Sequence, residues 1–229
     1  MNAMRMTLLV AVGVTTVRSA GPKPPTGVRV AGHVTMFEKD GAPSNDLGSA
    51  VIYLEGGEPA PLHPDTYTIT TSEKEFVPRV VVIPVGSTVE FANADPVSHN
   101  VFSASEPNTF DLGKYGRGKA RPHTFTAPGL ARVFCNVHPR MVAFVQVMAT
   151  PHYTQPAADG SFALDSVPPG HYTLVVWHER SPELAQDLTV GPAGVSGLVL
   201  QLDARGFHWV PHKNKHGQDY PTDEDFERY

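Results

Sequence analysis

The chain has 229 residues, of which 41% are hydrophobic and only 18% are charged, and it carries a net charge of −5. The 20 glycines and 22 prolines exclude a long-helix protein or a coiled coil, because those need stretches rich in Ala, Leu, Glu and Lys. The low charge and frequent apolar runs argue against wholesale disorder, and nothing in the negative balance indicates a nucleic-acid partner. The length suffices for one large domain or two ordinary ones.

The first 20 residues have the pattern of a secretory signal peptide. Arg5 precedes a short apolar run at 7–17, and small residues at 19–21 offer cleavage points. The run is too short to span a bilayer and no other segment reaches that length, so we expect no transmembrane segment in the mature chain. Arg18 lies close to the cleavage point and leaves a cytoplasmic N-terminus as the alternative. We expect a periplasmic or otherwise exported protein.

Short apolar segments follow one another along the rest of the chain, each bounded by Pro, Gly, Asn or Asp. Alternation at period two, as at 28–36, is typical of a strand with one buried face. We predict strands at 28–36, 50–54, 76–85, 87–92, 122–126, 131–134, 141–148, 161–164, 171–177, 187–190 and 197–202. Only residues 181–186 carry a helix-start signature, for one or two turns. Many short strands at regular spacing predict an all-β sandwich or barrel.

Composition also indicates where segments begin and end. Residues 58–64 are Pro-rich, which is typical of a linker, and 150–151 close the stretch that begins there. From residue 204 the chain loses its periodicity and becomes a polar tail. Three histidines in the tail are spaced by four, which would place them on one face of a helix and allow weak metal binding: His208, His212 and His216. Pro211 and Gly217 make a helix unfavourable there, so we expect a solvated tail.

The only cysteine, Cys135, follows a predicted strand directly and is joined by His138 and Met141 at intervals of three. With one cysteine no intramolecular disulfide can form, and a lone thiol in an exported protein is either a hazard or a working part. Upstream, another strand edge leads to His99. One thiolate, two imidazoles and one thioether are therefore available, although a buried structural cysteine and a core methionine are the plain alternatives.

The metals differ in how well this set suits them. Structural zinc takes four N, S or carboxylate ligands and gains little from a thioether. Iron–sulfur clusters need about four thiolates, and covalent haem attachment needs a C-x-x-C-H motif that is absent here. Copper cycling between Cu(I) and Cu(II) suits a trigonal His₂Cys set with a long, weak axial Met. Only a single copper ion uses all four residues.

The motif C-x-x-H-x-x-M at 135–141, with His99-Asn100 upstream, resembles the type 1 (blue) copper site of cupredoxins, with a short loop similar to that of amicyanin. The segments at 76–78, 83–91 and 110–113 also resemble the methylamine-utilisation-protein-like family. The resemblance implies a Greek-key cupredoxin sandwich with His99, Cys135, His138 and Met141 as copper ligands. It further implies that Asn100 ties the two ligand loops together from behind the ligands.

The flanking segments resemble a carboxypeptidase-regulatory-like (transthyretin-like) β-sandwich, on the residues at 32–35, 50–54, 159–164 and 167–176. The fold expectation is therefore all-β, with a cupredoxin sandwich inserted in or joined to a second, transthyretin-like sandwich. The expected boundaries are a signal peptide at 1–20, a discontinuous sandwich at 26–62 plus 150–203, a cupredoxin domain at 63–149 and a polar tail at 204–229.

These features predict an exported mononuclear copper protein that carries one electron between redox proteins and is not an enzyme. The expected partners are a donor and an acceptor such as a dehydrogenase or a cytochrome. The alternatives are a cell-envelope binding module with a structural or vestigial copper site, and a copper-trafficking protein. Six basic residues against two acidic ones between 97 and 149 fit either an ordinary solvated surface or steering toward an acidic partner.

Overall fold

The computed structural model describes residues 27–220, so the predicted signal peptide at 1–20 lies outside the described residues. Within this range the regular elements are strands, apart from one three-residue 3-10 turn, η1 (Leu47–Ser49). The all-β prediction is confirmed. No helix in this part of the chain has the length and apolar character needed to cross a bilayer.

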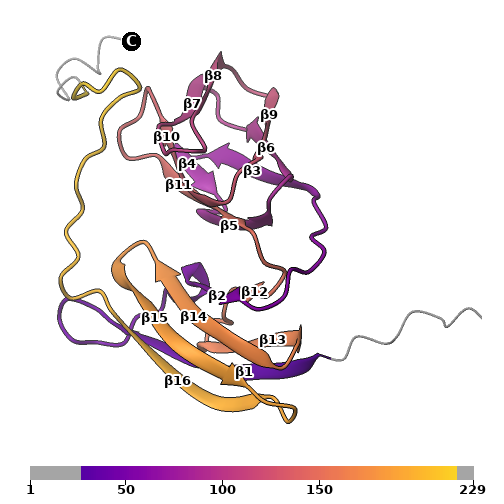
Figure 1. Cartoon of the computed structure of the whole chain (residues 1–229). Helices are drawn as coiled ribbons and strands as arrows, with labels where there is room; N and C mark the ends of the chain where they lie inside the picture. The colour runs from indigo at the N-terminus through magenta and orange to yellow at the C-terminus, as the bar shows by residue number, and fades with distance from the viewer. Residues whose placement is uncertain (1–26, 221–229) are drawn as a thin grey trace, which may run out of the picture.

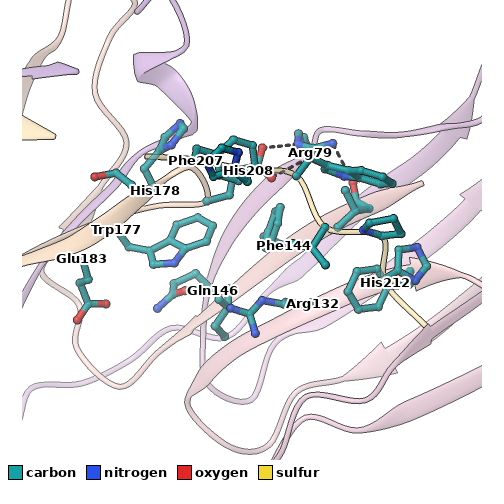
Figure 2. A pocket seen from close by; sticks show the side chains of 18 of the residues that line it. Arg79, Arg132, Phe144, Gln146, Trp177, His178, Glu183, Phe207, His208 and His212 are labelled. Carbon is teal, nitrogen blue, oxygen red and sulfur yellow. Dashed lines mark hydrogen bonds and ion pairs between the residues drawn. The ribbon is translucent and has the colours of Figure 1, made fainter. Parts of the chain in front are cut away.

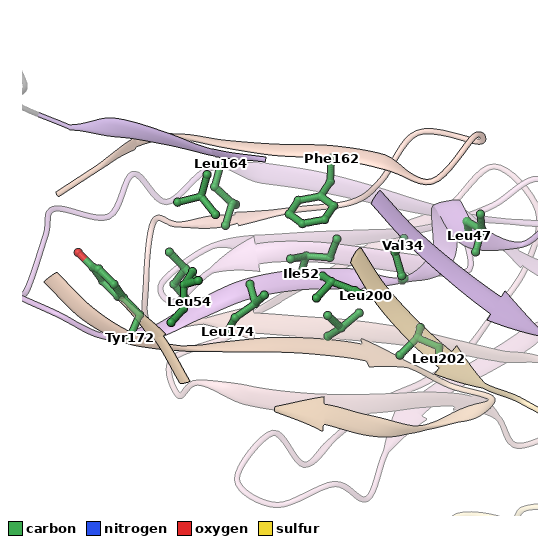
Figure 3. Close-up of a cluster of buried hydrophobic side chains, with 14 of the residues drawn as sticks. Val34, Leu47, Ile52, Leu54, Phe162, Leu164, Tyr172, Leu174, Leu200 and Leu202 are labelled. Atoms are coloured by element: carbon green, nitrogen blue, oxygen red, sulfur yellow. The ribbon is translucent and has the colours of Figure 1, made fainter. Parts of the chain in front are cut away.

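One pair of sheets is built from both ends of the described chain, and we call it the split sandwich (Figure 1). Its two facing sheets enclose one apolar cluster, in which Ile52, Leu174 and Leu200 are fully or almost fully buried (Figure 3). Alternation places Val30, Val34 and Met36 of one strand in this cluster, as the period-two pattern predicts. One sheet contains β13 (Ser161–Val167), β1 (Val28–Phe37) and β16 (Val195–Asp203), and the other β12 (Tyr153–Thr154), β2 (Val51–Gly56), β14 (Gly170–His178) and β15 (Ser181–Val190).

The chain leaves the split sandwich after β2, forms a second pair of sheets, and returns at β12. We call this second pair the inserted sandwich. Its core contains Phe91, Phe125 and Val133, all fully buried between the two sheets. The larger sheet contains β5 (Val80–Pro84), β11 (Val142–Met148), β10 (Gly129–Cys135), β7 (His99–Ser103) and β8 (Phe110–Tyr115), and the smaller β4 (Glu75–Val77), β3 (Thr66–Ser72), β6 (Thr88–Asn93) and β9 (Ala120–Thr124).

The two sandwiches pack against each other through a third apolar cluster. Phe144 on β11 and Trp177 on β14 meet there with ring centroids 5.3 Å apart. Beside them the Arg79 guanidinium donates two hydrogen bonds, of 2.6 and 2.7 Å, to the Glu179 carboxylate across the junction. Aromatic packing and a bidentate ion pair therefore hold the two sandwiches together.

Two of the predicted elements are wrong in detail. Residues 181–186 are not helical but form the start of β15, where Leu184 pairs with Val176. A helix of one or two turns is costly to nucleate, whereas pairing with β14 satisfies the backbone along a whole edge. The segment 76–85 is two strands in different sheets, because Pro78 lacks the N–H that a continuous ladder would need.

Candidate metal centre

Three of the residues singled out by the sequence meet at one end of the inserted sandwich. His99 is the first residue of β7 and Cys135 is the last residue of β10. These strands are antiparallel neighbours, with Cys135 opposite Val101, so the end of one lies beside the start of the other. His138 follows on the connection between β10 and β11. Strand pairing therefore brings His99 to the loop that begins at Cys135.

The facing atoms of these three side chains form a compact triangle. The Nδ1 atoms of His99 and His138 are 3.1 Å apart, and Cys135 Sγ lies 3.6 Å from each of them. The centre of that triangle lies about 2.0 Å from every corner, which is the usual length of an imidazole nitrogen–metal bond. Within residues 27–220 this is the only group of three or more His, Cys, Asp or Glu side chains gathered closely enough to share an ion. The donor set and its spacing fit one metal ion.

The three positions differ in burial. His99 and Cys135 are fully buried, whereas His138 is half-buried. An ion at this position would be shielded from bulk water, with the His138 ring as the part of the site nearest the surface. Such shielding strengthens the electrostatic interactions inside the site.

Met141 lies at the end of the same loop and is 1% exposed. Its N–H donates to the His138 carbonyl at 3.1 Å, and its own carbonyl accepts a bond of 3.3 Å from the Cys135 N–H. The side chain belongs to the same buried cluster as Cys135. These backbone hydrogen bonds close the loop from Cys135 to Met141 into a tight turn.

A buried carboxylate, Asp95, supports His99 from the side away from the triangle. It accepts a hydrogen bond of 2.8 Å from His99 Nε2 and bonds of 2.6 and 3.0 Å from the backbone N–H groups of Glu73 and Lys74. Burial alone raises the pKa of Asp95, but the hydrogen bonds from Lys74, His99 and Glu73 outweigh it and hold the pKa below the usual value. An ionised Asp95 accepts a hydrogen bond from His99 Nε2–H and so keeps the proton on Nε2, which leaves the Nδ1 lone pair facing the triangle.

The electrostatics of the other two corners also favour a metal. Burial, reinforced by the neighbouring His99, lowers the pKa of His138 to about 4, so its ring is neutral at neutral pH. Burial raises the pKa of the Cys135 thiol, against hydrogen bonds from the N–H groups of Val137, Asn100 and His138. A bound cation would compensate the thiolate for the loss of water, and the backbone donors are already in place.

Asn100 connects the two loops through its backbone. Its carbonyl accepts a hydrogen bond of 2.9 Å from the Asn136 N–H, next to Cys135. Its side chain points elsewhere and donates to Asp111 at 2.6 Å. The resemblance suggested the position of this residue but not which of its groups makes the link.

Most tail residues between 204 and 220 are exposed, as expected of a solvated segment, but a few of them contact the inserted sandwich. Between residues 204 and 220 the tail has no helix, and its histidines do not share one face. His212 is half-buried, and its ring stacks on Phe134 with centroids 4.0 Å apart. His208 and His216 are exposed. The spacing of four does not align these histidines, because the tail between 204 and 220 is not helical.

A cleft of about 860 Å³ opens between the two sandwiches beside this centre (Figure 2). Phe144, Trp177 and the Arg79–Glu179 pair contribute to its walls, and tail residues 207–212 close one side of it. Phe134 and Pro139 bring the cleft close to the loop that carries Cys135 and His138. None of the three corner atoms belongs to a residue that lines it, so the cleft and the metal centre are separate features.

Comparison with known proteins finds similar structures for part of the chain. No family model matches, and no curated protein is similar in sequence. A Cu-containing nitrite reductase from Thermus scotoductus SA-01 is 33% identical over 38% of this chain and 23% of its own, with a TM-score of 0.36. A purple cupredoxin from Nitrosopumilus maritimus is 28% identical over 36% of this chain and 99% of its own (TM-score 0.33). A reduced amicyanin mutant is 22% identical over 36% of this chain and 82% of its own (TM-score 0.35). Each of these structures is similar to just over a third of this chain.

Proposed function

We propose that this chain is a mononuclear copper protein that carries one electron at a time between redox proteins. The observation that carries the proposal is the triangle of two imidazole Nδ1 atoms and one buried thiol sulfur, 3.1 to 3.6 Å on a side. When bound there, copper would supply a centre that accepts and releases a single electron. His99, Cys135 and His138 would hold it, and the Met141 thioether would be a further, weak ligand.

The chain itself supplies what a rapid electron carrier needs. Two strands of one sheet and a loop closed by hydrogen bonds fix the ligands, so the site changes little when the charge of the ion changes. Asp95 holds His99 in the tautomer that presents Nδ1, and the apolar cluster around Cys135 excludes water. The half-buried His138 provides the shortest way for an electron to reach the surface.

The direct test is a copper titration of the full chain, followed by absorption spectroscopy and voltammetry. We expect one copper per chain, an intense thiolate-to-copper charge-transfer band and a reversible one-electron wave. A copper-loaded protein without such a band would refute the proposal. Turnover of a small molecule such as nitrite by the copper-loaded protein would instead indicate an enzyme.

Two other functions make different predictions. A cell-envelope binding module with a structural or vestigial copper site would keep its biological role in the Cys135→Ser variant, whereas an electron carrier would lose it. A copper-trafficking protein needs an exposed and labile site, so full burial of His99 and Cys135 favours electron transfer. Slow release of copper to a chelator would support an electron carrier, and fast release would support a trafficking protein.

We propose that the chain is exported and that its domains are a discontinuous transthyretin-like sandwich at 26–62 plus 150–203 and a cupredoxin domain at 63–149. The order of the sheets along the chain supports this division. N-terminal sequencing of the protein from its native host tests export, with a new N-terminus near residue 21 as the expected result. An unprocessed Met1 would contradict it.

A further inference from the structure

The C-terminal segment 207–220, which we call the strap, leaves the split sandwich after β16 and ends on the inserted sandwich (Figure 1). Its first contact is local, where the Phe207 N–H donates to the Ala204 carbonyl at 3.0 Å. Its later contacts include the three consecutive residues Phe134, Cys135 and Asn136. A segment that looks like a polar tail therefore reaches the residues around the proposed thiolate ligand.

Each strap contact has a defined partner. The Tyr220 hydroxyl donates a hydrogen bond of 2.7 Å to the carbonyl of Cys135. The Lys215 N–H donates to the side-chain oxygen of Asn136 at 2.8 Å. The His212 ring lies between Phe134, on which it stacks, and Tyr220, whose ring meets it edge-on at 5.2 Å. Hydrogen bonds and ring packing together fix the turn that follows β10.

The strap also reaches the other ligand loop, through one carboxylate. Lys215 Nζ lies 2.7 Å from Asp111 Oδ2, and Asp111 Oδ1 accepts the Asn100 side chain at 2.6 Å. Asn100 is the residue after His99 and accepts the Asn136 N–H through its carbonyl. Both loops that carry the proposed ligands are therefore attached to the same short segment.

We propose that Tyr220 is a positioning residue for the metal centre: its hydrogen bond fixes the Cys135 peptide group and so holds the thiolate in the triangle. This inference rests on the proposed function for the identity of the ion, but not for the contact itself. A site held loosely by its supporting residues loses its geometry, and a carbonyl fixed beside the ligand limits how far Cys135 Sγ can swing away from the two Nδ1 atoms.

The chain offers a matched control for removing the bond from the Tyr220 hydroxyl to the Cys135 carbonyl; the same hydroxyl also lies 3.4 Å from His212 Nδ1. The Tyr172 hydroxyl donates to the Pro168 carbonyl at 2.8 Å in the split sandwich, far along the fold from the metal centre. Tyr220→Phe and Tyr172→Phe therefore remove the same kind of hydrogen bond, and each keeps its ring. A general loss of stability would be similar in both variants, whereas an effect on the centre belongs to Tyr220 alone.

The test uses the full chain with two readouts. In the metal-free protein, 5,5′-dithiobis(2-nitrobenzoate) should modify Cys135 about fivefold faster in Tyr220→Phe than in wild type, the factor expected for one hydrogen bond, and no faster in Tyr172→Phe. In the copper-loaded protein, the charge-transfer band should shift in Tyr220→Phe and stay in place in Tyr172→Phe. Tyr220→Ala, which also removes the ring, should enlarge both effects.

The outcomes separate the two proposals. If wild type shows no charge-transfer band, the proposed function fails, and the thiol rates alone decide the role of Tyr220. If the band is present and both the band and the thiol rate are the same in Tyr220→Phe and Tyr172→Phe, the positioning role is overturned while the copper site stands.

Discussion

The two sandwiches bury different kinds of side chain. In the split sandwich the core is a continuous apolar cluster, and its buried polar residues in the described chain are only Ser44 and His178 (Figure 3). The inserted sandwich buries nine polar residues, and several of them surround the metal centre: Thr71, Ser87, Asn93, Asp95, His99, Asn100, Ser103, Asn108 and Gln146. Burying polar groups is costly unless each finds a partner. Their concentration in the inserted sandwich therefore supports placing the functional site there.

The largest expected effect comes from the thiol. Replacing Cys135 by Ser removes the soft ligand of the triangle, and we expect complete loss of the charge-transfer band. Copper affinity should fall by more than the roughly 100-fold that loss of a merely supporting residue costs. Absorption spectra and a competitive copper titration measure both effects. An unchanged band in Cys135→Ser would mean that the copper lies elsewhere.

The split sandwich should respond in stability rather than in spectrum. Leu174 is fully buried in its core, and we expect Leu174→Ala to lower the free energy of unfolding by about 2–5 kcal/mol because of the cavity it leaves. Chemical denaturation measures the loss. The position of the charge-transfer band should be unchanged, and a shifted band would show that the two sandwiches are not independent.

Each sandwich has a carboxylate beside a buried histidine, and the two pairs allow a direct comparison of the sandwiches. Asp95 accepts from His99 at 2.8 Å, and Asp46 lies 3.5 Å from His178 in the split sandwich. We expect Asp95→Asn to weaken copper binding by roughly 10- to 100-fold, because the amide no longer fixes the His99 tautomer. Asp46→Asn should leave copper binding unchanged. Equal effects of the two variants in a competition titration would contradict the supporting role of Asp95.

Acidification tests the buried histidine of the split sandwich. His178 Nε2 donates to the Asp46 carbonyl at 3.2 Å, and its Nδ1 accepts the Arg180 N–H at 3.1 Å, so the neutral ring is satisfied. Burial, with Arg180 adding to it and Asp46 and Glu179 opposing it, lowers the pKa of His178 below 6.5. As the pH falls, the unfolded chain therefore binds a proton at His178 before the folded chain does. The contribution of the neutral His178 ring to the free energy of unfolding is complete above pH 6.5 and is lost as the pH falls toward the folded pKa.

Titration of one group changes the free energy of unfolding by at most about 1.4 kcal/mol per pH unit. The variant His178→Gln can keep a donor and an acceptor but cannot titrate, so denaturation between pH 7 and pH 5 should show a weaker pH dependence than in wild type. Metal-free His138, whose pKa is lowered to about 4, contributes to both proteins alike. Identical slopes in the two proteins would rule out His178 as the source.

The smallest expected effect concerns charge near the metal loop. Arg140 is exposed between His138 and Met141, whereas Arg29 is exposed in the split sandwich. We expect Arg140→Gln to slow oxidation of the reduced protein by ferricyanide about two- to threefold at low salt, with the difference vanishing at high salt. Arg29→Gln should have no effect. A salt-independent change in stopped-flow rates would argue against steering.

Local patterns were sufficient to single out the three residues of the triangle but not the residues that support them. The spacing of Cys135 and His138 after a strand predicted the loop, and His99 was predicted to follow the end of an upstream strand. The strand β7, of which His99 is the first residue, was not predicted. Asp95 was visible in the sequence four residues before His99, but its role depends on backbone donors from 73–74 that only the sheet brings to it. The strap could not be predicted, because Tyr220 and Cys135 are 85 positions apart and no periodicity relates them.

The missed elements have a similar explanation. The strand β3 (Thr66–Ser72) is rich in threonine and offers little apolar contrast, with Ile69 and Thr71 as its buried residues, so its alternation is weak. Residues 181–186 at the start of β15 were taken for a helix start because Ser181 and Pro182 are typical of one, whereas pairing with the edge of β14 makes them part of a strand. Non-local pairing overrides local preference in both cases.

The convergence of a thiolate and two imidazoles on one ion is tested most directly by X-ray absorption spectroscopy of the copper-loaded full chain. We predict one thiolate sulfur and two imidazole nitrogens as the strongly bound neighbours of copper, with the nitrogens at about 2.0 Å. A copper environment made only of nitrogen and oxygen would contradict the account.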